Sequence, residues 1–364
     1  MFKRSFSRCF VIAAIGVPVI LTGCTSLSGS ADASKPSAAP LMALLPMFTA
    51  PGVPATGPAE QPVGRIGWPI PANDTLPGLP GKGIAEHPML YIGEGYNKIF
   101  LVNDGKVIWT YSTGGGNELD DIWMLTNGNI LFSRMGWAGE VTPDKKVVWR
   151  MEAPAGTEIH AIQPLGLDRV FLIENGLPPK MMIINIKTGV TEMTHELAIA
   201  DTTNSVHPQF RHARVTDKGT YLLPMLAGNK VVELDKDFKE IWSYKINKPW
   251  AAIRLLNGNT LITDESDKLT REVNPKGETV WEIKLSDLPE QFRLADCQSC
   301  IRLANGNTIL CSRGNNGKSP QLVEVNPDKK VVWVLQDWKD LGPASALQVL
   351  NDPGIPENPG ECQR

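Results

Sequence analysis

The chain has 364 residues, of which 42% are hydrophobic, and this is enough for one large folded domain. Its formal net charge is −3, from 36 basic and 39 acidic residues. Without Lys3, Arg4 and Arg8, which precede an N-terminal apolar run, 33 basic residues oppose 39 acidic ones and the net charge is −6. Because nucleic-acid affinity depends on basic contacts to phosphates, this balance predicts no nucleic-acid partner.

The N-terminus has the pattern of an export signal. Its basic start is followed by an apolar run from Phe10 to Leu21, which is too short to be identified as a membrane span. Residues 1–23 are therefore predicted to form a signal peptide, and the mature chain is expected outside the cytoplasm.

The end of this segment, Leu21-Thr22-Gly23-Cys24, resembles the bacterial lipobox. The resemblance implies that Cys24 becomes the lipidated first residue of the mature protein. Thr25, in place of Asp, implies sorting to the outer membrane. The alternatives are a signal peptide without lipidation and an uncleaved anchor. We predict a lipoprotein of the cell envelope, held by its N-terminal lipid in the periplasm or at the outer membrane.

The composition divides the rest of the chain. Residues 24–64 are rich in Ala, Pro, Ser and Gly and are predicted to be a flexible tether. Residues 65–88 contain several prolines and glycines and are predicted to be an irregular lead-in. The folded domain is predicted over 89–352, and residues 353–364 are a C-terminal tail.

The folded part is built from a repeated unit. Residues 255–262, Leu-Leu-Asn-Gly-Asn-Thr-Leu-Ile, reappear as 303–310, Leu-Ala-Asn-Gly-Asn-Thr-Ile-Leu, and each copy is followed by Glu-Val-Asn-Pro and then Val-Trp. Six marker positions follow this pattern, 40, 42, 51, 39 and 52 residues apart: Trp109, Trp149, Thr191, Trp242, Trp281 and Trp333. Repeats of this length indicate a ring or stack of similar units.

Each unit is predicted to contain four short strands. In the fifth unit these are residues 251–256, 260–264, 269–274 and 279–284, separated by Asn-Gly and Pro-Lys-Gly turns of the kind that hairpins need. No run has a sustained 3.6-residue period, which disfavours a helical repeat. The sequence thus predicts an all-β fold, a six-bladed β-propeller of four-stranded antiparallel blades.

The first unit lacks an inner strand, since it begins at Met89 and ends at Trp109. Residues 345–352 at the other end of the domain repeat the pattern of residues 252–257. We therefore predict that the C-terminal strand completes the first blade and closes the ring, which protects sheet edges from pairing with other chains.

Four cysteines lie beyond the N-terminal segment: Cys297, Cys300, Cys311 and Cys362. A c-type haem would need His where Ile301 stands, and no second cysteine pair or nearby histidine completes a zinc site. In an oxidising compartment these residues predict one or two disulfides, with Cys297–Cys300 and Cys300–Cys311 both open. No metal site is predicted.

Strand order decides which loops share a face of the ring. The Asn-Gly turns at 127–128, 257–258 and 305–306 lie on one face, here called the turn face. The links between successive blades lie on the opposite face, here called the link face. Unlike the turns, the residues expected around the channel at the link face differ in every blade: Asp120, Asp121, Glu158, His160, Arg211, His212, Trp250, Gln298, Ser299 and Ser345.

The link face is the predicted site. The middle hairpins of the blades add Arg134 and Arg313 to its ligand-binding candidates, which also include Asp120, Asp121, Glu158 and Trp250. His160, Arg211 and His212 are the catalytic candidates, since Arg and His suit an anionic or hydroxylated ligand. The alternative is that these residues only satisfy one another around a water-filled channel. The longest link, residues 196–211, is a candidate lid.

The repeat itself resembles two groups of proteins. The Leu-x-Asn-Gly-Asn-Thr-Leu-Ile hairpins and the following Glu-Val-x-Pro-x-Gly-x-x-Val-Trp resemble quinoprotein-like (PQQ-like) propeller repeats and the bacterial arylsulfotransferases. The second resemblance implies sulfate transfer on a channel histidine, with His160 or His212 as nucleophile and Arg211 holding the anion. Quinone-binding dehydrogenases need a larger ring, a calcium site and adjacent cysteines, so no PQQ cofactor is expected.

These observations predict a lipid-anchored propeller that binds a small polar or anionic ligand, carbohydrate-like or a sulfate or phenolic ester, at its central channel. An arylsulfotransferase-like enzyme is one alternative. A scaffold that uses the rim to bind another envelope protein is the other.

Overall fold

We describe a computed structural model of the chain, over residues 41–49, 78–114, 118–201 and 203–364. The chain divides into two units, Met1–Pro36 and Ser37–Arg364, and the blades belong to the second. The predicted signal peptide, the lipidation site Cys24 and most of the predicted tether and lead-in lie outside the described residues. Within the described ranges, no helix is both long and apolar enough to cross a membrane.

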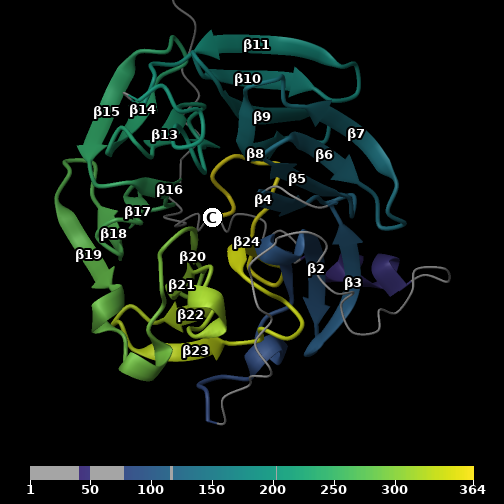
Figure 1. Cartoon of the computed structure of the whole chain (residues 1–364), viewed down its shortest axis with the longest axis vertical. Helices are drawn as coiled ribbons and strands as arrows, with labels where there is room; N and C mark the ends of the chain where they lie inside the picture. The colour runs from purple at the N-terminus through teal and green to yellow at the C-terminus, as the bar shows by residue number, and fades with distance from the viewer. Residues whose placement is uncertain (1–40, 50–77, 115–117, 202) are drawn as a thin grey trace, which may run out of the picture. The chain divides into compact units, whose positions relative to one another are not determined.

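The strands form six four-stranded antiparallel sheets arranged in a ring, as Figure 1 shows. The first three blades, each from its inner to its outer strand, have these bounds. Blade 1 contains β24 (Ala344–Val349), β1 (Met89–Gly93), β2 (Lys98–Asn103) and β3 (Lys106–Ser112). Blade 2 contains β4 (Leu119–Met124), β5 (Ile130–Arg134), β6 (Trp137–Val141) and β7 (Val147–Glu152). Blade 3 contains β8 (Glu158–Leu165), β9 (Arg169–Asn175), β10 (Lys180–Asn185) and β11 (Val190–Glu196).

The other three blades repeat this arrangement. Blade 4 contains β12 (Arg214–Val215), β13 (Tyr221–Met225), β14 (Lys230–Leu234) and β15 (Glu240–Lys245). Blade 5 contains β16 (Pro249–Arg254), β17 (Thr260–Asp264), β18 (Leu269–Val273) and β19 (Thr279–Lys284). Blade 6 contains β20 (Cys300–Arg302), β21 (Thr308–Cys311), β22 (Leu322–Val325) and β23 (Val331–Leu335). Short 3₁₀ helices lie between strands: η2 (Gly83–Ala85), η3 (Glu94–Tyr96), η4 (Leu285–Asp287), η5 (Glu290–Phe292) and η6 (Asn315–Gly317).

The predicted six-bladed β-propeller is confirmed, and so is the closure of its ring. β24 pairs with β1 in antiparallel register, with Met89 opposite Val349 and Tyr91 opposite Leu347. The last strand of the domain therefore forms the inner strand of the first blade. In the fifth blade, the four predicted strands match β16 to β19 to within two residues at each end.

The repeated polar residues stabilise the turn face. In blade 6 the Asn307 amide donates to Glu324 at 2.6 Å, and in blade 5 Asn259 donates to Glu272 at 2.7 Å. In the divergent blade 4 a Thr220 hydroxyl donates to the corresponding Glu233. The Asn of each Asn-Gly-Asn turn and the Glu of Glu-Val-Asn-Pro are thus hydrogen-bond partners, which explains why they recur together.

The repeated tryptophans join neighbouring blades. The Trp109 indole N–H donates to Pro143 O of blade 2 at 2.8 Å, and Trp281 donates to Pro327 O of blade 6 at 3.0 Å. Trp333 in the last blade donates instead to Gly83 O in η2 at 2.8 Å. In these three blades the marker residue therefore hydrogen-bonds to a turn in the next blade, or to the segment before β1.

Part of the predicted tether is ordered. Residues Leu41–Thr49 form a 3₁₀ helix, η1, and Leu41, Leu45 and Phe48 are buried in a cluster with side chains of blades 1 and 2. Phe48 contacts the Trp109 ring edge-on, with 5.5 Å between ring centroids. A short apolar stretch inside the Ala- and Pro-rich region therefore packs against the propeller.

The cysteines expected to form disulfides are all free thiols in the structure. Cys297, Cys300 and Cys311 are buried, the first two in the core between blades 5 and 6. Burial raises the pKa of Cys297 and of Cys311 to about 12, so both are neutral. They pack as small apolar side chains, which corrects the expectation of disulfides among these residues.

The C-terminal tail covers the turn face. Glu357 accepts hydrogen bonds from the Thr126 backbone N–H at 2.6 Å and from its hydroxyl at 2.8 Å, and Gln363 accepts one from the Leu256 N–H at 3.0 Å. Gly360 lies so close to Asp217 that a Cβ atom would meet the Asp217 Cβ at 2.9 Å. The tail thus touches inner turns of several blades and runs to the centre of the ring (Figure 1).

Candidate functional site

A cluster of charged side chains lies on the link face where the inner strands begin. Glu118 precedes β4, and Asp120 lies within it. Glu158 and His160 lie in β8, one blade further along. The link between β11 and β12 supplies two more members, His207 and Arg211. Trp250 in β16 and Arg313, which follows β21, complete the cluster.

The short inner strand of blade 4 places Arg211. The predicted strand is interrupted, because the His212 N–H donates to Trp250 O of blade 5 at 3.1 Å instead of pairing within its own blade. Regular pairing resumes only at Arg214. Arg211 therefore lies in a link, where its side chain can reach across the start of blade 3.

His160 is held between two carboxylates. Its Nδ1 lies 2.9 Å from Asp120 Oδ2, and its Nε2 lies 2.7 Å from Glu158 Oε2. Burial and the nearby Arg211 would lower the pKa of His160, but the two carboxylates outweigh them and the pKa is raised. Burial would raise the pKa of Glu158, yet the hydrogen bonds from His160 and His207 lower it to about 2. These groups form charged hydrogen bonds.

The tautomer of His207 follows from its neighbours. Arg211 Nη2 lies 3.2 Å from His207 Nε2, and a guanidinium can only donate, so Nε2 accepts. The ring proton is then on Nδ1, which donates to Glu158 Oε2 at 2.9 Å. His207 is 45% exposed, so its basic nitrogen lies at the border of the cluster with solvent.

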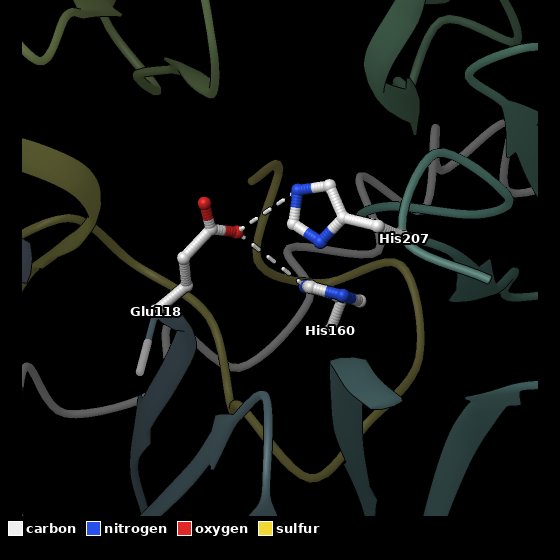
Figure 2. A group of neighbouring side chains, drawn as sticks. All are labelled: Glu118, His160 and His207. Atoms are coloured by element: carbon white, nitrogen blue, oxygen red, sulfur yellow. Dashed lines mark ion pairs between the residues drawn. The ribbon is translucent and has the colours of Figure 1, made fainter. Parts of the chain in front are cut away.

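Glu118 lies among four cationic or potentially cationic groups. Its Oε2 is 3.9 Å from His160 Nδ1, 3.8 Å from His207 Nε2 and 4.0 Å from Arg211 Nη2, and its Oε1 is 3.9 Å from Arg313 Nη1. Figure 2 shows the carboxylate of Glu118 facing the two imidazole rings. These separations exceed the length of a hydrogen bond.

Two guanidinium groups share the Trp250 ring. The Cζ atom of Arg211 lies 4.8 Å from its centroid and that of Arg313 lies 5.9 Å away. The indole Nε1 of Trp250 and the Nε of Arg211 are both buried and have no hydrogen-bond partner among the described residues. Two buried donors without acceptors in one place are unusual in a folded protein, and each has a desolvation cost.

The structure places three predicted site residues elsewhere. His212 is 2% exposed and its Nε2 donates to the backbone O of Asp120 at 2.8 Å, while burial lowers its pKa to about 4. Asp121 pairs with Arg214, with Nη1 to Oδ2 at 2.7 Å. Arg134 donates to Gly114 O at 2.9 Å and so supports the link before β4. The structure thus brings together His160, Arg211, Asp120, Glu158, Trp250 and Arg313.

Sequence reasoning missed Glu118 as a site residue and gave His207, in the longest link, no catalytic or ligand-binding role. Both lie outside the inner strands, on links whose path a strand pattern cannot predict. One feature of the sequence does point to His207: it lies four residues before Arg211 in the longest link, so a histidine and an arginine occur close together there. Together with His160, Glu118 and His207 offer ligand atoms that all lie within 4.8 Å of one another, a set that could hold a metal ion.

Comparison with known proteins supports the fold and leaves the activity open. No family model and no curated protein matches the chain. A protein of unknown function from Bacteroides caccae is similar in structure, with 28% identity, a TM-score of 0.65 and coverage of 71% of this chain and 97% of its own. A streptogramin B lyase is similar with 13% identity, a TM-score of 0.51 and coverage of 73% and 86%. What the chain shares with these proteins is the β-propeller.

Proposed function

We propose that this chain is a lipid-anchored propeller of the cell envelope that binds a small polar or anionic ligand at the link-face mouth of its channel. The observation that supports the binding site is the pair of buried donors without acceptors, Arg211 Nε and Trp250 Nε1, beside the Arg313 guanidinium. A ligand oxygen that accepts from them would remove a desolvation cost of about 1–3 kcal/mol for each donor.

The anchor is proposed from the sequence alone. Leu21-Thr22-Gly23-Cys24 resembles a lipobox, and the Ala- and Pro-rich residues after it suit a tether. Metabolic labelling with a palmitate analogue is expected to label the wild-type chain in a bacterial envelope and not the Cys24→Ala variant. Equal labelling of the two would contradict the anchor without affecting the proposed binding site.

The geometry favours binding over sulfate transfer by the predicted nucleophiles. Both ring nitrogens of His160 are engaged with carboxylates, and His212 is buried with its Nε2 on a backbone oxygen. A nucleophilic histidine needs an unprotonated nitrogen that the substrate can reach. In this arrangement neither residue offers one.

The binding proposal predicts a specific effect of Trp250→Phe, which keeps the ring and removes only the N–H donor. The full-length protein is screened by calorimetry against p-nitrophenyl sulfate, simple carboxylates, uronic acids and neutral sugars. We expect wild type to bind at least one of them. Trp250→Phe is expected to weaken that ligand about tenfold, since a lost hydrogen bond of about 1.4 kcal/mol corresponds to that factor.

Trp281→Phe is the matched control, because Trp281 lies in the outer strand β19 and donates its N–H to Pro327 O in a turn of blade 6. It should leave the affinity unchanged. If wild type binds none of the probes, or if the two variants lose affinity equally, the proposed site is wrong. A protein partner lost only by rim substitutions would favour the scaffold alternative instead.

A further inference from the structure

We propose that Glu118, His160 and His207 on the link face form a binding site for one divalent metal ion of the Zn²⁺ class. The three ligands come from three separate segments, the link before β4, strand β8 and the link before β12. Figure 2 shows all three side chains pointing toward one space. The proposal departs from the sequence prediction, which assigned no metal.

The distances between the ligand atoms suit an ion between them. Glu118 Oε2 lies 3.9 Å from His160 Nδ1 and 3.8 Å from His207 Nε2. Metal–ligand bonds of about 2.0–2.2 Å place two ligands of one ion roughly 3–4 Å apart, depending on the angle at the metal. Asp120 Oδ2 lies 2.9 Å from His160 Nδ1, so an ion bound at that nitrogen would replace the hydrogen bond between them.

Glu158 positions both imidazoles through their far nitrogens. Its Oε2 is 2.7 Å from His160 Nε2 and 2.9 Å from His207 Nδ1, while the opposite nitrogen of each ring faces Glu118. Metal-ligating histidines almost always donate their second ring N–H to a carboxylate or carbonyl in this way. One carboxylate therefore fixes two histidines whose other ring nitrogens both lie within 3.9 Å of Glu118 Oε2, and this distinguishes the cluster from an acidic patch.

The charge balance also favours a cation. Glu118, Asp120 and Glu158 surround the two histidines, and Arg313 is within 4.0 Å of three further carboxylates, those of Glu94, Glu265 and Asp296. Against these six acidic groups stand the guanidinium groups of Arg211 and Arg313. Imidazole nitrogens with carboxylate oxygens favour borderline ions such as Zn²⁺, Fe²⁺ or Ni²⁺ over Mg²⁺ and Ca²⁺.

In this structure Arg211 occupies the place next to the proposed ion. Its Nη2 is 3.2 Å from His207 Nε2 and 4.0 Å from Glu118 Oε2. A metal ion would displace that contact, while the stacking on Trp250 and the hydrogen bond to Phe210 O at 3.2 Å could remain. The guanidinium would then be free to bind an anionic ligand beside the metal.

The proposal is tested on the full-length protein after removal of metals with a chelator. Titration with ZnCl₂ by calorimetry is expected to show one saturable site, and Co²⁺ is expected to give visible absorption bands of nitrogen and oxygen coordination. A tenfold excess of MgCl₂ should not compete. No saturable one-to-one binding of Zn²⁺ by the wild-type protein would overturn the proposal.

Variants locate the site. His207→Ala and Glu118→Gln are expected to abolish the Zn²⁺ isotherm and the Co²⁺ spectrum. Glu158→Gln should weaken Zn²⁺ by about 10–100-fold, the usual effect of losing a group that orients metal ligands. Arg211→Met should tighten Zn²⁺, because a competing cation is gone. His195→Ala is the matched control and should bind Zn²⁺ like wild type. His195 lies in the outer strand β11, where its ring stacks on Phe238.

Folding of each variant is verified by its thermal transition without metal, and Zn²⁺ should raise the transition of only the variants that bind it. Unchanged Zn²⁺ affinity in His207→Ala would also overturn the proposal. The test is separate from that of the proposed ligand, since Trp250→Phe should weaken the ligand and leave Zn²⁺ bound. Arg211→Met should weaken the ligand and strengthen the metal.

Discussion

At the scale of single residues, the same residue types serve two purposes in this chain. Asn259 and Glu272 recur from blade to blade and stabilise turns through their mutual hydrogen bond. Glu158 and His160 occur in one blade only, and their hydrogen bond lies in the charged cluster of the link face. A carboxylate that recurs with a turn residue is therefore structural, whereas one that differs between blades is a candidate for function.

Glu324 gives a prediction at this scale. Burial would raise the pKa of Glu324, but hydrogen bonds from His87 and Asn307 outweigh it and lower the pKa below the usual 4.5. A carboxyl group with a lowered pKa stabilises the fold above its unfolded value of 4.5, and that stabilisation is lost as pH falls through the folded value. Glu324→Gln should therefore show a smaller loss of unfolding free energy than wild type below pH 4.5.

The measurement is urea unfolding at a series of pH values between about 3 and 7. Glu278→Gln, which alters a carboxylate bonded to Asn274 in an exposed turn, is the control and should keep the wild-type slope. Identical slopes for wild type and Glu324→Gln would show that the pair of His87 and Glu324 does not couple folding to protonation.

At the scale of elements, the blades are joined through the marker tryptophans as well as through apolar packing. Trp281 reaches Pro327 in the next blade, and Trp333 reaches Gly83 before β1. The Trp333 side chain is 1% exposed, whereas the hydrogen bond from Trp281 to Pro327 is exposed to solvent. The same side chain at the same repeat position therefore has a different energetic weight in different blades.

Phenylalanine substitutions should reveal this difference, since they remove the N–H and keep most of the ring. Trp333→Phe removes a part-buried hydrogen bond of a buried side chain and is expected to lower the unfolding free energy by about 1–3 kcal/mol. Trp281→Phe is expected to cost about 0.5–1 kcal/mol, because water can replace its contact. Chemical denaturation measures both, and a larger loss for Trp281→Phe would contradict the proposed role of burial.

At the scale of the whole molecule, the ends of the folded region close the structure. β24 completes the first blade, and residues 353–364 then cross the turn face to the centre of the ring. Arg364 donates to Leu347 O at 3.1 Å and stacks 4.1 Å above the Trp123 ring. The tail lies on the turn face and the site cluster lies on the link face, so the two are at opposite ends of the channel.

Removal of the tail should therefore destabilise the ring without opening it. A chain that ends at Asp352 keeps β24 and loses the contacts of Glu357 and Gln363. Its melting temperature should therefore fall, while its circular-dichroism spectrum should remain that of a β-sheet protein. Glu357→Ala alone is expected to cost about 1–3 kcal/mol, since the two donors of Thr126 lose their acceptor. A truncated chain as stable as wild type would show that the tail only rests on the surface.

The fold could be predicted because its cause is local and repeated. Asn-Gly turns, alternating apolar runs and the marker tryptophan specify each hairpin within a few dozen residues. The displaced copy of an inner strand at 345–352 was enough to predict ring closure. The free state of the cysteines could not be predicted in this way, since no local pattern distinguishes a cysteine packed in the core, such as Cys297 or Cys311, from one in a disulfide.

The amino-acid sequence by itself determined the blades, their number and the face where chemistry should be sought, because hydrogen bonds between neighbouring strands follow from short-range pattern. Only the tertiary structure decided which candidates meet. His160 and Arg211 converge with Glu118 and His207, whereas His212 turns inward, because the inner strand of blade 4 breaks and pairs with blade 5. The path of a link depends on contacts between blades, and no local pattern encodes it.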